Sequence, residues 1–246
     1  MLKKLLSALS IVVLFLLTSC NSVEGDIFQV KKVKASSDLD PKDVPALLDR
    51  NKIPFERIAS VNWEETFPYC PEVSFRIAHT GDAVLVHFKV KEEAVQAIAS
   101  KDNGSVWKDS CVEFFVSPSC DDTYYNIESN CVGNILVQYG KKGPSRPVAS
   151  LETVSLIRRW SSLGREPIME PITGDGGVEW EYVEIIPKEV FFGDNIVSFS
   201  GMEMTANFYK CGDSLPTPHY LSWAPIEFER PQFHMPEFFR KIYFSK

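Results

Sequence analysis

Apolar and polar residues alternate along most of this chain, a pattern typical of β-strands with one buried face. Residues 73–77 alternate in this way, residues 80–82 read Thr-Gly-Asp, and residues 84–90 alternate again, which predicts a β-hairpin. Further strands are expected at 135–139, 178–186, 196–209, 219–223 and 238–244. About ten strands with little helix predict an all-β fold, an antiparallel β-sandwich of the jelly-roll type.

A few segments carry other patterns. Asp40 followed by Pro41 predicts the start of a short helix over residues 41–49. The apolar residues of 92–99 have helical spacing and predict a second short helix, whereas 151–160 is expected to be a strand. Helix is therefore expected to be a minor part of the fold.

The segment 104–130 is the most informative stretch for function. It predicts a loop that carries Trp107, a strand at 109–116, a turn, and a second strand at 124–130. The loop around Trp107 is rich in Gly, Asn and Asp, where an indole is harder to bury than in the middle of a strand. We therefore expect an indole at the edge of a two-stranded surface.

Two carboxylates, Glu113 and Glu128, occupy positions in these strands where a half-buried sheet normally carries apolar residues. Because side chains alternate faces, the even-numbered residues of 112–116 form the core face and Glu113 lies on the opposite face. A hairpin could present both carboxylates beside the indole of Trp107. Such a surface suits a polyhydroxylated ligand, with acceptors for its hydroxyls and a flat ring for its C–H face.

The residues alone leave several roles open for these side chains. Glu113 and Glu128 could accept hydrogen bonds from sugar hydroxyls, or they could be the acid and nucleophile of a glycosidase, which needs two carboxyls roughly 5 to 9 Å apart. They could also be structural groups that cap a loop amide or pair with a lysine. Trp107 is either a stacking platform or a plug at the end of the core.

The charge of the chain excludes one class of partner. The formal charge is −7, and about −9 if Lys3 and Lys4 are removed with a leader. Nucleic-acid binding needs a basic patch, and the sequence has no cluster of Lys and Arg interleaved with aromatics. Nucleic acid is therefore not an expected partner.

The N-terminus resembles a bacterial lipoprotein signal. Two lysines precede the apolar run 5–17, and Leu-Thr-Ser-Cys follows at 17–20. This resemblance implies cleavage before Cys20 and lipidation of that cysteine, which would anchor the protein to the bacterial outer membrane, on the cell surface or the periplasmic face. The expected organisation is a signal peptide at 1–19, a lipidated tether at 20–40 and one β-sandwich domain at 41–246.

Cysteines and acidic loops leave metal binding undecided. An odd number of cysteines besides Cys20 means at least one free thiol, and the sequence does not fix any pairing. None forms a Cys-x-x-Cys motif or alternates with histidine, so the spacing does not indicate zinc. No cofactor is required, but oxygen-rich loops could hold a structural calcium, although no EF-hand spacing exists. The cysteines are Cys70, Cys111, Cys120, Cys131 and Cys211, and the loop residues are Asp102, Asn103, Asp109, Asp121 and Asp122.

Residues 106–115, Val-Trp-Lys-Asp-Ser-Cys-Val-Glu-Phe-Phe, are similar to the Trp-x-x-Asp-Ser-Val-Glu-Ile-Phe segment of family 9 carbohydrate-binding modules, apart from one inserted letter. Later segments resemble those of family 9-like bacterial lipoproteins, and the resemblance covers roughly residues 63–244. These segments are Tyr-Tyr-Asn at 124–126, Ala-Asn-Phe-Tyr at 206–209, His-Tyr-Leu-Ser-Trp at 219–223 and Phe-His-Met-Pro-Glu-Phe at 233–238.

The resemblance implies a β-sandwich that clamps a terminal sugar between two aromatic rings. By correspondence with the family, Trp107 would be one of these rings. Phe233 would be the second ring, at a position where the family's binders have Trp. Glu113 would accept a hydroxyl, Glu128 stands near the place of a family arginine, and Asn207 lies on a strand that supplies another polar contact. The implied function is non-catalytic capture of carbohydrate, with glycoside hydrolases or transporters as further partners. The alternatives are a glycosidase and a structural or assembly lipoprotein without a sugar ligand.

Overall fold

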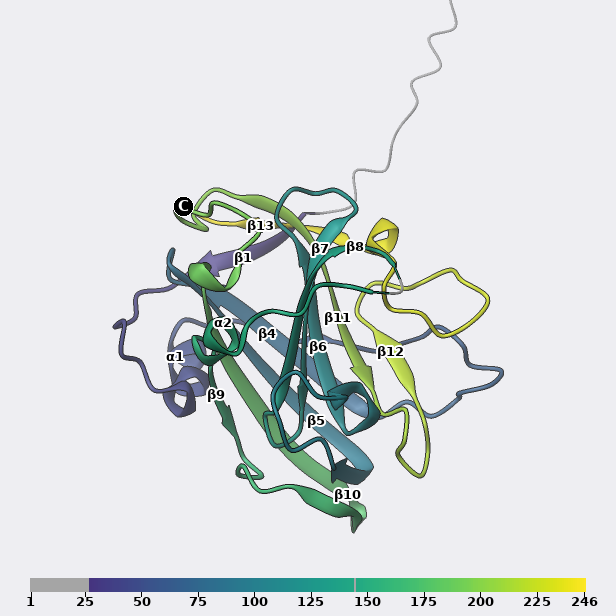
Figure 1. Ribbon diagram of the computed structural model, residues 1–246. Coiled ribbons are helices and arrows are strands. Elements are labelled where there is room, and N and C mark those ends of the chain that lie inside the picture. Colours follow the sequence, from purple (N-terminus) through teal and green to yellow (C-terminus); the bar gives the residue numbers. More distant parts are fainter. Residues whose placement is uncertain (1–26, 144) are drawn as a thin grey trace, which may run out of the picture.

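The computed structural model describes residues 27–143 and 145–246, so the expected signal peptide and Cys20 lie outside the described residues. Strand is the main secondary structure of the described chain, with short helical turns between strands (Figure 1). The elements in chain order are β1 (Phe28–Lys32), η1 (Pro41–Asp43), α1 (Val44–Arg50), β2 (Glu56–Arg57), β3 (Ser60–Val61), β4 (Glu72–His79), β5 (Ala83–Ala97), η2 (Val106–Lys108), β6 (Cys111–Ser117), β7 (Thr123–Asn130), β8 (Ile135–Lys141), α2 (Leu151–Ser155), β9 (Arg158–Ser161), β10 (Ile168–Pro187), η3 (Lys188–Val190), β11 (Glu203–Cys211), β12 (Tyr220–Ser222), η4 (Pro236–Phe238) and β13 (Arg240–Phe244).

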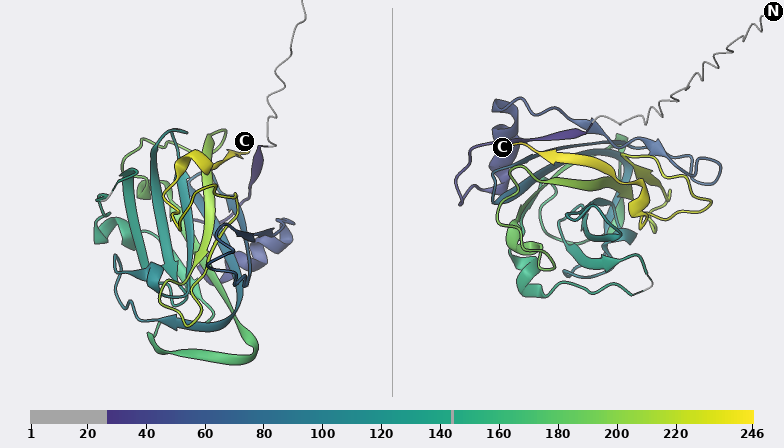
Figure 2. Two further views of the ribbon diagram at one scale, coloured as in Figure 1. Left: turned by 90° about the vertical axis from the view of Figure 1, so that its right-hand side faces the viewer. Right: turned by 90° about the horizontal axis from the view of Figure 1, so that it is seen from above.

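The strands form one curled sheet whose two halves face each other (Figure 2). The order across the sheet is β8-β7-β6-β11-β13-β1-β4-β5-β10-β9, with β12, β3 and β2 attached beside this path. β1 joins the halves because it pairs in parallel with β13 on one side and with β4 on the other. The predicted all-β, sandwich-like fold is confirmed.

The main core fills the space between the two halves of the sheet. Phe208 of β11 stacks on Phe75 of β4, with ring centroids 3.6 Å apart, and on Phe114 of β6, with centroids 4.8 Å apart. Val112 and Val116 belong to the same buried cluster. The even-numbered residues of β6 therefore face the core, as the alternation predicts, and its odd-numbered residues face outward.

The N-terminal boundary of the domain differs from the sequence-based prediction. Residues 28–32, expected to lie in the tether, form β1, and Val30 is fully buried. The strand pairs Gln29 with Tyr243 and Lys32 with His79. Such pairing joins segments far apart in the chain, and no local pattern in five residues reveals it.

Three secondary-structure predictions were wrong. The strand expected at 196–209 begins only at Glu203 and runs to Cys211 as β11. Residues 92–97 continue β5 instead of forming a helix, because β10 runs alongside and pairs Val95 with Ile172. Tertiary pairing here overrides the helical spacing of the apolar residues. Segment 151–160 divides into the helix α2 and the strand β9, and the side chain of Ser150 caps α2 by accepting a hydrogen bond from the amide of Thr153.

The outer faces of the two halves are covered differently. On the β4–β5–β10 half, the apolar side of α1 packs on Leu85 and Ile185, and α1 lies outside the sheet in Figure 2. On the β6–β7–β11 half, long loops cover the sheet and enclose a second apolar cluster. This loop-covered face positions the candidate site. Among the described helices, none has the length and apolarity needed to cross a bilayer.

Candidate functional site

A pocket of about 300 Å³ opens on the loop-covered face, above β6, β7 and β11. Its floor comes from the outward-facing positions of these strands and its walls come from the covering loops. Four of the five predicted carbohydrate-binding residues line it together. The lining residues are Trp107, Glu113, Glu128, Leu136, Gln138, Cys211, Asp213, Tyr220, Pro231, Gln232, Phe233 and His234.

The two predicted carboxyl groups meet at the floor. Glu113 of β6 and Glu128 of β7 are direct partners in the antiparallel register, so their side chains leave the same face of the sheet side by side. Tyr209 of β11 is the partner of Glu113 on the other side. Both carboxyl groups are almost fully buried, at 3% and 4% exposure. The expected hairpin therefore presents both carboxyl groups on one face.

Glu128 is held by Asn126 and, through it, by Arg146, which the sequence did not single out. The amide of Asn126 donates a hydrogen bond to Oε1 of Glu128 at 2.7 Å, and Nε of Arg146 donates to Oδ1 of Asn126 at 3.1 Å. Burial raises the pKa of Glu128 to about 7, although the bond from Asn126 and the charge of Arg146 oppose the rise. Arg146 comes from the loop after β8, so it supplies a cation close to the strand where the family resemblance placed one.

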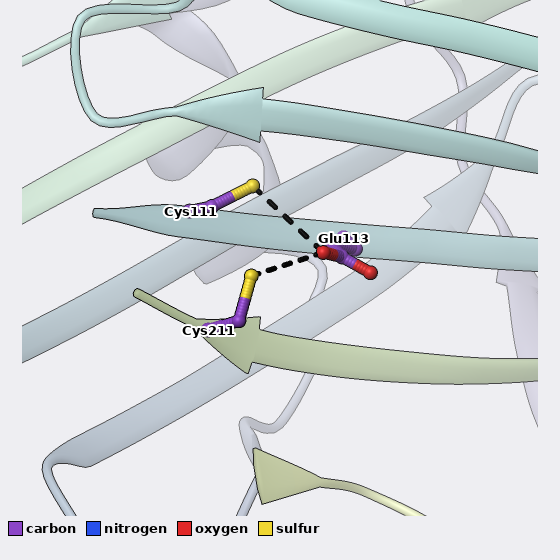
Figure 3. A group of neighbouring side chains, drawn as sticks. All are labelled: Cys111, Glu113 and Cys211. Carbon is purple, nitrogen blue, oxygen red and sulfur yellow. Dashed lines mark hydrogen bonds between the residues drawn. The ribbon is translucent and has the colours of Figure 1, made fainter. Parts of the chain in front are cut away.

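Glu113 has a different environment. Its Oε1 lies 3.1 Å from Sγ of Cys211 and 4.0 Å from Sγ of Cys111, whereas Oε2 has no hydrogen-bond partner among the described residues (Figure 3). Burial, and then the neighbouring Cys211 and Glu128, hold the pKa of Glu113 well above its usual value. These surroundings favour the protonated form of Glu113, in which the carboxyl group can both donate and accept a hydrogen bond.

Trp107 stands at the wall of the pocket on η2 and is half-buried. Its carbonyl oxygen accepts hydrogen bonds from the amide of Asp213 at 3.3 Å and from Sγ of Cys211 at 3.4 Å, which ties its turn to the end of β11. The side chain packs at the margin of the second apolar cluster without being enclosed by it. The turn that carries Trp107 is thus fixed against β11, and the indole ring remains accessible from the pocket.

Phe233 also lines the pocket, but it offers little surface. One face of its ring stacks on Tyr209, with centroids 4.2 Å apart and planes 12° apart, and Trp63 and Tyr220 pack around it. Only 9% of Phe233 is exposed. The aromatic contribution to the pocket is therefore unequal, with Trp107 much more available than Phe233.

His234 completes the wall with a neutral polar group. Its Nδ1 lies 2.9 Å from the hydroxyl of Tyr124. Burial, together with the charges of Arg146 and Lys142, lowers the pKa of His234 to about 4. The ring is therefore uncharged at neutral pH. His234 lies in the segment 233–238 that resembles the family, but the sequence analysis assigned it no role, because its loop has no regular pattern.

Asn207 does not contribute to the pocket, which corrects the prediction made from the family resemblance. It is fully buried, and its amide nitrogen donates to the carbonyl of Ala224 at 3.1 Å. Its Oδ1 accepts hydrogen bonds from the amides of Phe208 and Ala224, each at 2.9 Å. Its polar atoms thus hold the following loop against β11 and are not presented to a ligand.

The oxygen-rich loops use several of their acceptors within the protein. Both carboxylate oxygens of Asp102 bind Arg159, at 2.8 and 3.0 Å. The carboxylate of Asp109 accepts hydrogen bonds from the amides of Ile98 and Ala99, each at 3.0 Å. These two aspartates organise loops, and the calcium expectation gains no support from them.

The comparisons with known proteins agree with this architecture. Residues 42–244 match the model of carbohydrate-binding family 9. A provisionally named carbohydrate-binding protein from Bacteroides uniformis ATCC 8492 is 52% identical, with a TM-score of 0.85 over 90% of this chain and 100% of that chain.

A more distant likeness concerns the fold alone. A family 9 carbohydrate-binding module from Caldicellulosiruptor kristjanssonii, solved with cellotriose, is 11% identical, with a TM-score of 0.54 over 89% of this chain and 94% of that chain. Its complex with glucose gives the same identity and TM-score over 88% and 95%. No curated protein matches the chain. The family match over almost the whole described domain shows that this chain belongs to carbohydrate-binding family 9.

Proposed function

We propose that the pocket beside Trp107 binds one sugar unit, the end of a neutral glycan, without chemically changing it. The observation that carries this proposal is the placement of an accessible indole at the wall of a small pocket whose floor is two paired carboxyl groups. A volume of about 300 Å³ is at the lower end of small-molecule sites, which suits a single ring better than a long segment of chain.

The chemistry of the pocket favours a neutral sugar. Burial favours the protonated form of Glu113, keeps His234 uncharged at neutral pH and leaves Glu128 only partly ionised. A sugar hydroxyl both donates and accepts, and a neutral carboxyl matches it in both roles. An acidic sugar would bring a further negative charge to a site that already holds Glu128 and Asp213, so uronic acids are expected to bind more weakly.

The cellular role that fits this site is glycan capture at a membrane. The leader and Cys20 support a lipid-anchored protein of the bacterial outer membrane, on the cell surface or the periplasmic face. The relative from Caldicellulosiruptor was solved with cellotriose and with glucose, which supports a carbohydrate ligand here. Glycoside hydrolases or transporters would then receive the captured carbohydrate.

A glycan array followed by calorimetry tests the proposal. The mature protein is expected to bind a neutral glycan, and Trp107→Ala should lose at least about tenfold in affinity, since tenfold corresponds to about 1.4 kcal/mol of lost stacking. Trp160→Ala is the matched control, because Trp160 is also half-buried but lines a separate groove on the other half of the sheet. Equal affinity of the Trp107 variant and the wild type would remove the stacking model.

One observation favours an enzyme as the second candidate. Glu113 and Glu128 are a buried carboxyl pair with raised pKa values, an arrangement that glycosidases also use. A glycosidase would turn over an aryl glycoside and lose this activity in Glu113→Gln. A binding protein gives no turnover with either form. The structural alternative, a lipoprotein without a sugar ligand, predicts that no glycan on the array is retained.

A further inference from the structure

Three side chains with metal-binding atoms meet at the floor of the pocket (Figure 3). They are the thiols of Cys111 and Cys211 and the carboxyl of Glu113, and their ligand atoms all lie within 4.8 Å of one another. We infer that these three residues form a site for a thiophilic divalent cation such as Zn²⁺, with a fourth coordination position open to the pocket.

The separations of the atoms are close to those that zinc requires. Zinc binds thiolate at about 2.3 Å and carboxylate oxygen at about 2.0 to 2.2 Å, so ligand atoms in a tetrahedral site lie roughly 3.3 to 3.8 Å apart. Oε1 of Glu113 is 3.1 Å from Sγ of Cys211 and 4.0 Å from Sγ of Cys111. Small side-chain rotations would satisfy both distances. Two sulfurs select a borderline-soft ion over calcium or magnesium, which prefer oxygen ligands.

The register of the sheet builds this group from distant parts of the chain. Cys111 and Cys211 are direct partners across β6 and β11. Glu113 is two residues beyond Cys111 on the same strand, so its side chain leaves the same face. Both strands lie inside the sheet, with paired strands on each side. The three ligands are therefore held on rigid elements, as a preorganised site needs.

Glu113 also carries an oxygen that is unpartnered among the described residues and points away from the two sulfurs (Figure 3). Oε2 of Glu113 is buried, and no donor in the described part of the chain bonds to it. A buried polar atom without a partner is unfavourable, and a ligand is one of the ordinary explanations for it. Glu113 and Cys211 line the pocket, whereas Cys111 is completely buried behind them. An ion could therefore reach the site from the pocket side, and water or a hydroxyl could take the fourth position.

A disulfide between the same two cysteines is the competing outcome in an exported protein. All five cysteines in the described residues are free thiols, and both sulfurs here face the carboxyl of Glu113 (Figure 3). Binding of Zn²⁺ would displace the protons of both thiols and the carboxyl proton of Glu113 to solvent, and it needs no oxidant.

The test uses the mature protein, reduced and freed of metal, with Zn²⁺ and Co²⁺ as the only probes. We expect one equivalent of Zn²⁺ to bind, and Co²⁺ to give the intense near-ultraviolet band of thiolate coordination. Cys111→Ser and Cys211→Ser should each abolish that band and weaken Zn²⁺ binding at least about 100-fold, since even loss of outer-shell partners costs 10- to 100-fold. Cys70→Ser is the matched control, because Cys70 is an exposed thiol outside the group.

Glu113→Gln provides a readout if a serine variant fails to fold, because glutamine keeps the size of the side chain. It should weaken Zn²⁺ binding while the two sulfurs still give the cobalt band. Zn²⁺ affinity that is the same in Cys211→Ser and wild type would overturn the inference, and so would a Cys111–Cys211 disulfide in protein released from its native membrane. The probes are metal ions alone, so the result is independent of whether a glycan binds.

Discussion

Arg146 is expected to be the residue whose loss most damages the polar floor of the pocket. It is 7% exposed, and its guanidinium lies 3.8 Å from the ring centroid of Tyr124. Its nitrogens donate to the carbonyls of Tyr124, Gly140 and Lys141, at 2.6, 2.5 and 3.0 Å, and to Oδ1 of Asn126 at 3.1 Å. One side chain therefore joins the ends of β7 and β8 and orients the amide that holds Glu128.

Arg146→Met keeps the aliphatic stem of the side chain and removes all four of these hydrogen bonds. Two of the acceptors that lose their donor, the carbonyl of Tyr124 and Oδ1 of Asn126, belong to fully buried residues. Each buried acceptor left without a hydrogen bond should lower the free energy of unfolding by about 1 to 3 kcal/mol. The lost contact with the aromatic ring adds about 1 kcal/mol. The free energy of unfolding should therefore fall by roughly 4 kcal/mol, a large part of the stability of an ordinary domain.

Urea unfolding followed by tryptophan fluorescence measures this loss. Arg158→Met is the matched control, because Arg158 is half-buried and its Nη1 donates to one carbonyl, that of Leu39, at 2.7 Å. The control should lose about 1 kcal/mol. In the Arg146 variant, glycan affinity should also fall about tenfold, since Asn126 no longer orients Glu128. A loss below 1 kcal/mol, or one equal to that of the control, would refute this reasoning.

Two further predictions concern buried polar groups outside the pocket. Burial raises the pKa of Glu184 to about 8 despite the charge of Arg159, so its folded pKa exceeds the unfolded value of 4.5. The contribution of Glu184 to the free energy of unfolding is full below pH 4.5 and falls by about 1.4 kcal/mol per pH unit as pH rises toward 8, by about 4 kcal/mol in total. Urea unfolding at pH 5 and pH 8 measures this pH dependence, which Glu184→Gln should remove. The same pH dependence in the variant and the wild type would contradict the prediction. Asn207→Ala should lower the free energy of unfolding by about 2 to 4 kcal/mol, because the backbone N–H and C=O of Ala224 lose their hydrogen-bond partner. The glycan affinity of the folded protein should stay unchanged. A tenfold weaker affinity at unchanged stability would show instead that Asn207 contacts the ligand.

Local alternation was enough to predict the strands around the site. The faces of β6 follow from the period of two, so the outward position of Glu113 could be predicted from its immediate neighbours. The turn after that strand then sets the register that places Glu128 opposite it. The expectation that Trp107 lies beside them depended on the family resemblance as well as on its loop. These features are either local in the chain or carried by a recognisable segment.

The rest of the site depends on contacts that join distant segments. Cys111 and Cys211 are neighbours only because of the pairing of β6 with β11, and their spacing in the sequence carries no metal motif. Arg146 lies in a loop without a regular pattern, and its partners are visible only after β7 and β8 have paired. Asn207 is the opposite case, because it was predicted to contact the ligand and its side chain instead bonds to the backbone of a nearby loop.

The most direct test of the central claim is a crystal structure of the mature protein with the glycan that the array retains best. We predict one sugar ring against the indole of Trp107, with hydroxyls within hydrogen-bond distance of Glu113 and Glu128. Sugar bound instead in the groove lined by Trp160, with the pocket beside Trp107 empty, would contradict it.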